Sequence, residues 1–119
     1  MSNELQSKAI QAATRFVERR GYEVLDEGWR PEGSKSQIDL VAQDEDAIVF
    51  IEVTANDSDE GGFGEGRTGR GELELLAAKW LGEHSPEGDV SVRFDSISMI
   101  VVSADRALLR HHINCFSEA

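Results

Sequence analysis

The chain is poor in cysteine and proline, and it has no long apolar run. Its one cysteine, Cys115, excludes an internal disulfide, so the fold must depend on the burial of apolar side chains. No stretch approaches the roughly 20 apolar residues of a membrane-spanning helix. Residues 1–20 carry charges throughout, unlike a secretory signal. We therefore expect a cytoplasmic soluble protein with no membrane partner, and a single domain over residues 1–119.

Basic residues are also scarce. Only 12 lysines and arginines stand against 23 aspartates and glutamates, which gives a net charge of −11. Proteins that bind nucleic acid usually present a basic face, because phosphate contacts dominate their affinity. A strong non-specific nucleic-acid binder is therefore not expected. Binding would require a local basic patch or a bridging metal ion.

The hydrophobic pattern predicts helices and strands in a mixed order. Apolar residues recur at spacings of three and four over residues 4–20, which predicts a helix that Gly21 ends. The remaining pattern predicts strands at 22–29, 37–42 and 47–54, a helix at 72–81, one or two strands at 91–103, and a short helix or irregular tail at 104–116. The short turn at residues 43–46 indicates a β-hairpin. Together these elements predict a mixed sheet flanked by helices.

Residues 56–71 hold six glycines and predict a mobile loop. Gly64, Gly66 and Gly69 match the spacing of a dinucleotide-binding motif, but no strand ends just before them and no βαβ unit surrounds them. A loop that contacts phosphate through Arg67 and Arg70 is a better interpretation. Near the other end of the chain, a zinc site is not expected, because His111, His112 and Cys115 offer too few ligands without a second cluster.

Glu52 is the most informative single residue. It interrupts the apolar run of residues 49–53, and an unpaired buried carboxylate is costly. Asp39 lies in the preceding predicted strand, so a short hairpin would bring the two side chains together. Two neighbouring carboxylates repel each other unless a cation lies between them, and oxygen ligands suit Mg²⁺ or Mn²⁺. Asp39 and Glu52 thus predict a metal site that activates water against a phosphodiester. The alternative is that either acid pairs with an arginine or faces solvent.

Several short motifs occur in a fixed order along the chain. They are Arg19-Arg20-Gly21-Tyr22, Gly28-Trp29-Arg30, Ile38-Asp39-Leu40-Val41-Ala42, Ile48-Val49-Phe50-Ile51-Glu52-Val53, Arg93-Phe94-Asp95, and His111 with Asn114-Cys115-Phe116. In this order they resemble the YraN family of the PD-(D/E)xK nuclease-like superfamily over nearly the whole chain. The resemblance implies a restriction-endonuclease-like α/β fold of three layers, with a central mixed sheet flanked by helices. It also implies Mg²⁺-dependent phosphodiester cleavage at the acidic pair.

Where the chain departs from this family pattern, a charged residue of the site is lost or its sign is reversed. The Glu-x-Lys motif is Glu52-Val53-Thr54 here, and a threonine hydroxyl cannot supply the cation that a lysine would. Ile10, Gln37 and Asn56 stand where the resemblance places two glutamates and an arginine. The start of the second long helix, at residues 71–74, is acidic where the family is basic. We therefore expect weak or lost catalysis at a site formed by Asp39, Glu52 and Thr54.

Other side chains offer compensation for these losses. Lys35 lies four residues before Asp39, close enough for a long side chain to reach back, and Glu72 or Glu74 would replace a missing glutamate. The basic residues available to contact nucleic acid are Arg30, Lys35, Arg67 and Arg70. Three functions remain open: a degenerate nuclease-like protein that binds nucleic acid or a protein without cutting, an active Mg²⁺-dependent nuclease with a relocated lysine, and a protein-interaction module.

Overall fold

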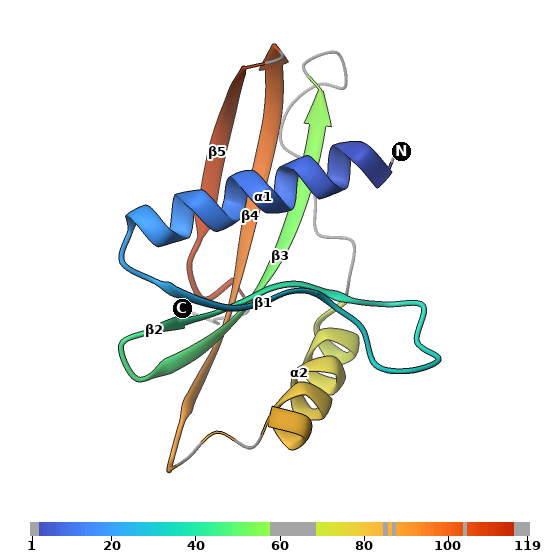
Figure 1. Cartoon of the computed structure of the whole chain (residues 1–119), viewed down its shortest axis with the longest axis vertical. Helices are drawn as coiled ribbons and strands as arrows, with labels where there is room; N and C mark the ends of the chain where they lie inside the picture. Colours follow the sequence, from blue (N-terminus) through green and yellow to red (C-terminus); the bar gives the residue numbers. More distant parts are fainter. Residues whose placement is uncertain (1–2, 58–68, 85, 87, 104, 116–119) are drawn as a thin grey trace.

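The computed structural model describes residues 3–57, 69–84, 86, 88–103 and 105–115 (Figure 1). It contains two helices and five strands in the described residues. In chain order they are α1 (Asn3–Arg19), β1 (Glu23–Trp29), β2 (Ile38–Asp44), β3 (Ala47–Asp57), α2 (Arg70–His84), β4 (Ser91–Ser103) and β5 (Arg106–His112). None of the described helices is long and apolar enough to cross a membrane.

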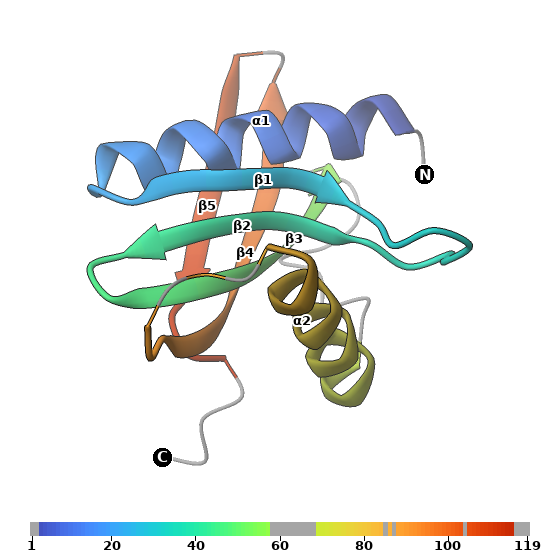
Figure 2. The same ribbon diagram turned by 60° about the horizontal axis from the view of Figure 1, so that its bottom comes forward.

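The five strands form one mixed sheet in the order β1-β2-β3-β4-β5. Only the β3–β4 pair is parallel, because α2 connects these two strands and carries the chain back to the same end of the sheet. The other three pairs are antiparallel. Figure 2 shows the strong twist of this sheet, since β1 and β2 run across the direction of β4 and β5.

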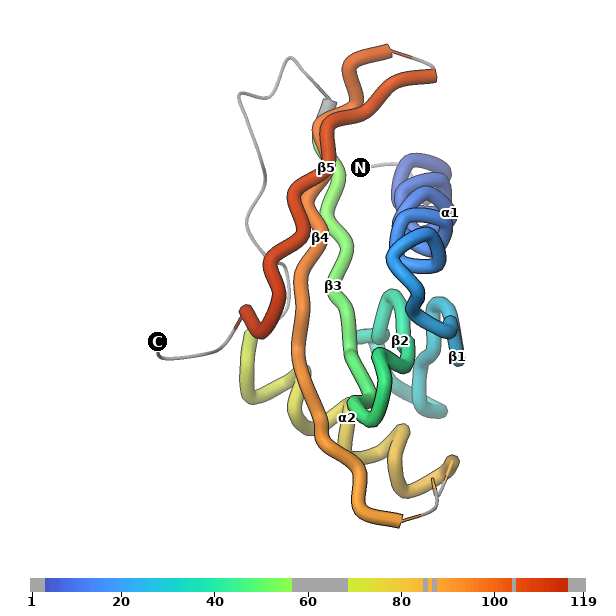
Figure 3. The backbone as a smooth tube through the Cα atoms, turned by 90° about the vertical axis from the view of Figure 1, so that its left-hand side faces the viewer, coloured from blue at the N-terminus to red at the C-terminus, as the bar shows by residue number. Residues whose placement is uncertain are grey.

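The two helices cover opposite faces of the sheet. The face of β3 that carries Val49, Ile51 and Val53 packs against α1, whereas Ile48 and Phe50 pack against α2. Figure 3 shows α1 standing off β3, β4 and β5 as a separate layer. Burial on both faces explains why β3 is nearly continuous in apolar residues rather than alternating. The arrangement confirms the predicted three-layer α/β class with a central mixed sheet.

The prediction was wrong for the segment after β4, where β5 replaces the expected short helix or irregular tail. The burial of β5 alternates along its length, with Ala107, Leu109 and His111 less exposed than their neighbours. This period of two is the signature of a strand with one buried face. The interspersed Arg106, Leu108 and Arg110 hid the pattern, because Leu108 is an apolar residue on the exposed side.

The loop expected at residues 56–71 is shorter than predicted at both ends. Strand β3 continues through Asp57, and α2 already begins at Arg70. Pairing with β4 continues to the Asn56↔Ile100 and Asp57↔Val101 positions, so tertiary contacts extend β3 beyond its apolar run. The predicted mobility concerns mainly residues 58–68, which lie outside the described residues.

Candidate functional site

The hairpin of β2 and β3 positions the two acidic residues. Its register ends at the Leu40↔Ile51 pair, and Asp39 and Glu52 are the next residues along β2 and β3 beyond that pair. Both side chains are nearly inaccessible, with 2% of Asp39 and 7% of Glu52 exposed. The structure thus puts the two predicted acids on adjacent strands, each one residue beyond the last paired position.

Two of the interactions of Asp39 are hydrogen bonds that orient its carboxylate. Its Oδ2 accepts the backbone N–H of Val53 at 2.9 Å, and its Oδ1 accepts the side-chain amide of Gln37 at 2.8 Å. The hydrogen bond from the Val53 N–H links β2 and β3 beyond the Leu40↔Ile51 pair, because the Asp39 carboxylate accepts it in place of a backbone carbonyl. On the same residue, the Val53 carbonyl accepts the amide of Gln6 from α1 at 3.0 Å. Asp39 therefore has a structural role as well as a potential chemical one.

Gln37 connects Asp39 to a cation that the sequence singled out. Arg30 Nη2 donates to Gln37 Oε1 at 3.2 Å, while the Gln37 amide donates to Asp39. Arg30 and Gln37 border a small hollow of about 430 Å³ next to the first half of α1 and the end of β1. Arg30 is thereby linked to Asp39 through Gln37, whereas Lys35 is exposed in the β1–β2 connection.

Thr54, at the position of the missing lysine, lies on the same face as Glu52. Its hydroxyl donates to Ser98 Oγ of β4 at 3.3 Å, and only 7% of Thr54 is exposed. The register across the sheet aligns Thr54 with Ser98 and Ser98 with Arg110 of β5. Cross-strand neighbours share a face, so Thr54, Ser98 and Arg110 form a polar row across β3, β4 and β5. Only Ser98 lies between Arg110 and Thr54 in this row.

A second polar row runs parallel to the first. Glu52 aligns with Ser96 of β4, and Ser96 aligns with His112 of β5. Sequence reasoning did not place Arg110 and His112 on this face, because β5 was not predicted as a strand, and it therefore missed their alignment with Ser98 and Ser96. The burial of residues 106–112 alternates, but the exposed Leu108 hides that alternation in the sequence.

The remaining predicted residues have other surroundings. Arg70 forms an exposed ion pair with Glu74 one helical turn away, at 3.5 Å. Glu72 accepts a hydrogen bond from the Ser36 hydroxyl, which ties the start of α2 to the segment before β2. Arg67 lies outside the described residues. Within the described part of the chain, no three histidine, cysteine or acidic side chains gather as a metal cluster.

The site therefore offers two buried carboxylates to a metal ion. Mg²⁺ demands six oxygen ligands and keeps several waters when only one or two carboxylates are available. Asp39 and Glu52 fit that ion in donor chemistry, but each oxygen of Asp39 already accepts one hydrogen bond. Asp39 and Glu52 are therefore the two residues of this site that could hold a metal ion.

Comparison with known sequences decides the family of the chain. The profile of the uncharacterised protein family UPF0102 matches residues 11–99, from within α1 to the middle of β4. This chain belongs to UPF0102. The resemblance to the YraN family is thereby confirmed. The match covers all three positions of the candidate site.

Individual UPF0102 relatives align over most of the chain. A UPF0102 protein of Beutenbergia cavernae is 36% identical over 105 residues, covering 85% of this chain and 86% of the relative. A UPF0102 protein of Pelotomaculum thermopropionicum is 34% identical over 110 residues, with 89% of each chain covered. One from Frankia casuarinae is 40% identical over 86 residues, or 70% of each chain.

The two late motifs of this UPF0102 chain meet in the structure, away from the acidic pair. Asp95 of β4 is fully buried and accepts two hydrogen bonds from Arg93, at 2.9 and 3.0 Å. It also lies 2.8 Å from His111 Nε2 and accepts the backbone N–H of Asn114 at 2.9 Å. The separate Arg93-Phe94-Asp95 and His111–Asn114 motifs are therefore parts of one hydrogen-bonded cluster on the α1 face.

This Asp95 cluster joins three strands of the sheet, β2, β4 and β5, and the residue just before β1. Arg93 also binds Asp44 at the end of β2 at 3.0 Å, and donates to the Tyr22 hydroxyl just before β1 at 2.6 Å. The His111 ring packs edge-on against Phe16 and Tyr22. Because Asp95 accepts at Oδ2, the hydrogen-bond geometry assigns a proton to His111 Nε2. The cluster is a structural clamp, since every charged member has an opposite charge or a hydrogen bond inside it.

The charges of the cluster shift one another's acidity. Burial alone raises the pKa of Asp95, but hydrogen bonds from His111, Arg93 and the Asn114 backbone outweigh it. The pKa of Asp95 therefore lies below its ordinary value of 3.8. The hydrogen bond to Asp95 raises the pKa of the Arg93 guanidinium, against the opposing effect of burial. Burial is also the main reason that the pKa of Tyr22 is raised.

Acid should destabilise the fold through Asp95. Because its pKa is lower in the folded chain than in the unfolded one, it stabilises the fold above pH 3.8, and this contribution is lost as pH falls through the folded value. Thermal unfolding between pH 7 and pH 3 should show a steeper acid loss for the native protein than for Asp95→Asn. Asp89→Asn, at an exposed position, should behave as the native protein does. Equal slopes for native protein and Asp95→Asn would contradict this assignment.

Proposed function

We propose that this UPF0102 protein is an endonuclease-like nucleic-acid-binding protein with weak or lost phosphodiesterase activity. The observation that carries the proposal is the burial of the Asp39 and Glu52 carboxylates on adjacent strands, with Thr54 in place of the motif lysine. Such a pair suits a weakly held Mg²⁺ or Mn²⁺ ion. When bound, this ion would neutralise phosphate charge and lower the pKa of a water molecule.

The protein's own residues would mainly position the substrate. The Val53 N–H and the Gln37 amide fix the orientation of Asp39, and the Gln37 amide in turn is held by Arg30. Arg30 lies close enough to this network to contact a phosphate of the bound strand. The Thr54 hydroxyl contributes a hydrogen bond but no charge. Phosphodiester attack would therefore proceed without the fixed cation that stabilises its transition state.

A second candidate is an active nuclease whose cation comes from β5. The observation that favours it is the row of Thr54, Ser98 and Arg110 across three strands. Two small hydroxyl side chains lie between the arginine and the acidic pair, so a long side chain is not blocked by a bulky neighbour. In this alternative Arg110 takes the role that the sequence suggested for Lys35, Arg67 or Arg70.

Metal binding tests the acidic pair directly. We expect the native protein to bind one Mn²⁺ weakly, and Glu52→Gln to bind it at least roughly tenfold less tightly, because a charged ligand is removed without a change of shape. The electron paramagnetic resonance signal of free Mn²⁺ in a titration measures both affinities.

Glu83→Gln is the matched control for this titration, since Glu83 is exposed on α2 and should leave Mn²⁺ binding unchanged. Equal Mn²⁺ affinity for native protein and Glu52→Gln, with both variants folded, would remove the metal site and with it the nuclease-like assignment.

A further inference from the structure

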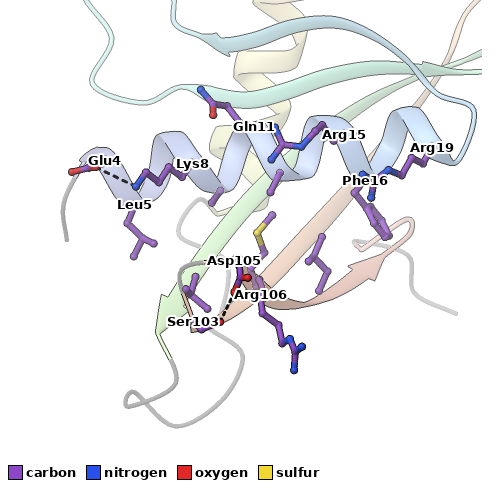
Figure 4. Close-up of a pocket in the computed structure, with 16 residues that line it drawn as sticks. Glu4, Leu5, Lys8, Gln11, Arg15, Phe16, Arg19, Ser103, Asp105 and Arg106 are labelled. Atoms are coloured by element: carbon purple, nitrogen blue, oxygen red, sulfur yellow. Dashed lines mark hydrogen bonds and ion pairs between the residues drawn. The ribbon is translucent and has the colours of Figure 1, made fainter.

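A groove on the α1 face bears the opposite charge to the rest of the molecule. It has a volume of about 870 Å³ and lies between α1, the C-terminal half of β4 and the N-terminal half of β5, as Figure 4 shows. Its lining includes four cations, Lys8, Arg15, Arg19 and Arg106, but only two acids, Glu4 and Asp105. The whole chain has about twice as many acids as bases, so this excess of cations is local.

Two of these cations, Arg15 and Arg19 of α1, are available to a partner on this face. Glu4 is engaged with Lys8 at 3.3 Å, and Asp105 accepts the Ser103 hydroxyl at 3.0 Å. Within the described parts of the chain, Arg15 and Arg19 form no ion pair or hydrogen bond of their own through their side chains. A guanidinium that is not paired within its own chain is well suited to bind a carboxylate through two parallel hydrogen bonds.

The floor of the groove is apolar and mostly aliphatic. It is formed by side chains of α1 and of the sheet, namely Leu5, Ala9, Ala12, Phe16, Met99, Val101, Ala107 and Leu109. Several of these are only partly buried, so the groove leaves apolar surface to be covered. A single aromatic ring is a poor stacking surface for a row of bases, which argues against single-stranded nucleic acid as the occupant. Aliphatic side chains of a peptide fit this floor better.

The cations on α1 follow a helical spacing. Lys8, Arg15 and Arg19 lie seven and four residues apart, which puts them along one side of the helix over about 16 Å. A second helix lying beside α1 would present carboxylates with the same spacing and place its apolar side chains on the floor. Charge complementarity thus favours a helix that carries carboxylates as the occupant of this groove.

We propose that this groove is a docking site for an acidic amphipathic helix of another protein. The apolar side chains of the partner would fill the floor, and its carboxylates would meet Arg15 and Arg19 and compete with Glu4 for Lys8. The groove lies on the α1 face, opposite to the face that carries Glu52 and Thr54. The proposal is therefore independent of the proposed nuclease-like function.

A designed peptide tests this site with the full-length protein. The peptide is a fluorescent amphipathic helix with glutamates at positions i, i+7 and i+11 and leucines on the adjoining face, and its scrambled sequence is the negative control. We expect the ordered peptide to bind at least roughly tenfold more tightly than the scrambled one, with an affinity that falls as salt rises. Fluorescence anisotropy measures both.

Charge reversal locates the binding. Arg15→Glu and Arg19→Glu should each weaken peptide binding severalfold, while Lys79→Glu on the exposed side of α2 should leave it unchanged. Thermal unfolding of each variant verifies that the fold is intact. Equal affinity of Arg15→Glu and native protein for the peptide would overturn the proposal.

Two further arms distinguish other occupants. Tighter binding of a thymidine oligonucleotide than of the peptide, weakened by Arg15→Glu, would assign the groove to nucleic acid and overturn the peptide proposal. Self-association in sedimentation that Arg19→Glu abolishes would assign it to a second copy of this chain, which also contradicts the proposal. Loss of Mn²⁺ binding in Glu52→Gln leaves the peptide result unaffected, so the two proposals fail separately.

Discussion

Replacing Thr54 with lysine is expected to raise the rate of phosphodiester cleavage in Mg²⁺ roughly a hundred- to a thousandfold. Cleavage builds negative charge around phosphorus, and a fixed ammonium group beside Glu52 would stabilise it where the threonine hydroxyl cannot. The native protein should cut DNA and RNA very slowly or not at all. An assay with Mg²⁺ and with Mn²⁺ on single-stranded, double-stranded and branched substrates measures both rates.

Thr54→Met is the matched control, because it has similar length without the charge and should not gain activity. Thr54 is buried, so a longer side chain should cost about 1–3 kcal/mol of unfolding free energy, and thermal unfolding must show that both variants fold. A folded Thr54→Lys protein that binds Mn²⁺ but stays inactive would contradict the degenerate-site interpretation. Robust cleavage by native protein that Arg110→Gln abolishes would establish the second candidate instead.

Removing the Asp95 carboxylate is expected to lower the free energy of unfolding by about 3–5 kcal/mol, because breaking a buried charge pair leaves an uncompensated partner. In Asp95→Ala, Arg93 retains Asp44, but His111 and the Asn114 N–H lose their acceptor. The links between β4, β5 and the segment after β5 are then broken together. Urea unfolding at pH 7 followed by circular dichroism measures the loss.

Asp89→Ala is the control for this measurement, since an exposed acid should change stability by about 0.5 kcal/mol or less. A cycle with Arg93→Ala and the double variant isolates the pairwise contribution of Asp95 and Arg93. If Asp95→Ala destabilised the protein no more than Asp89→Ala, the cluster would have no structural role, and its buried charges would call for a functional explanation.

Most of the architecture could be predicted from local sequence patterns. The helix at α1 follows from apolar spacing and from Gly21, whose φ of +92° suits a helix end that glycine tolerates best. The hairpin of β2 and β3 follows from two apolar runs and a short turn. This hairpin places Asp39 and Glu52 on adjacent strands, so the location of the two acids could also be predicted from the sequence.

The sequence did not determine β5, because its outward positions include Leu108 as well as Arg106 and Arg110. A strand with an apolar residue on its exposed side loses the alternation by which strands are recognised. Only pairing with β4 establishes its register. The polar rows that end at Arg110 and His112 follow from that register, and they were therefore invisible in the linear sequence.

The sequence alone determined several properties of this protein. They are the absence of an internal disulfide, the helix α1, the β2–β3 hairpin, and the location of Asp39 and Glu52 on adjacent strands. These depend on residue type and on spacing within one or two elements. Tertiary structure decided what each polar group contacts. Asp39 supports the β2–β3 pairing through Val53, and Asp95, His111 and Arg93 form one buried cluster. Such contacts join residues far apart in the chain, and burial gives them their strength, since hydrogen bonds and charges matter most where water is excluded.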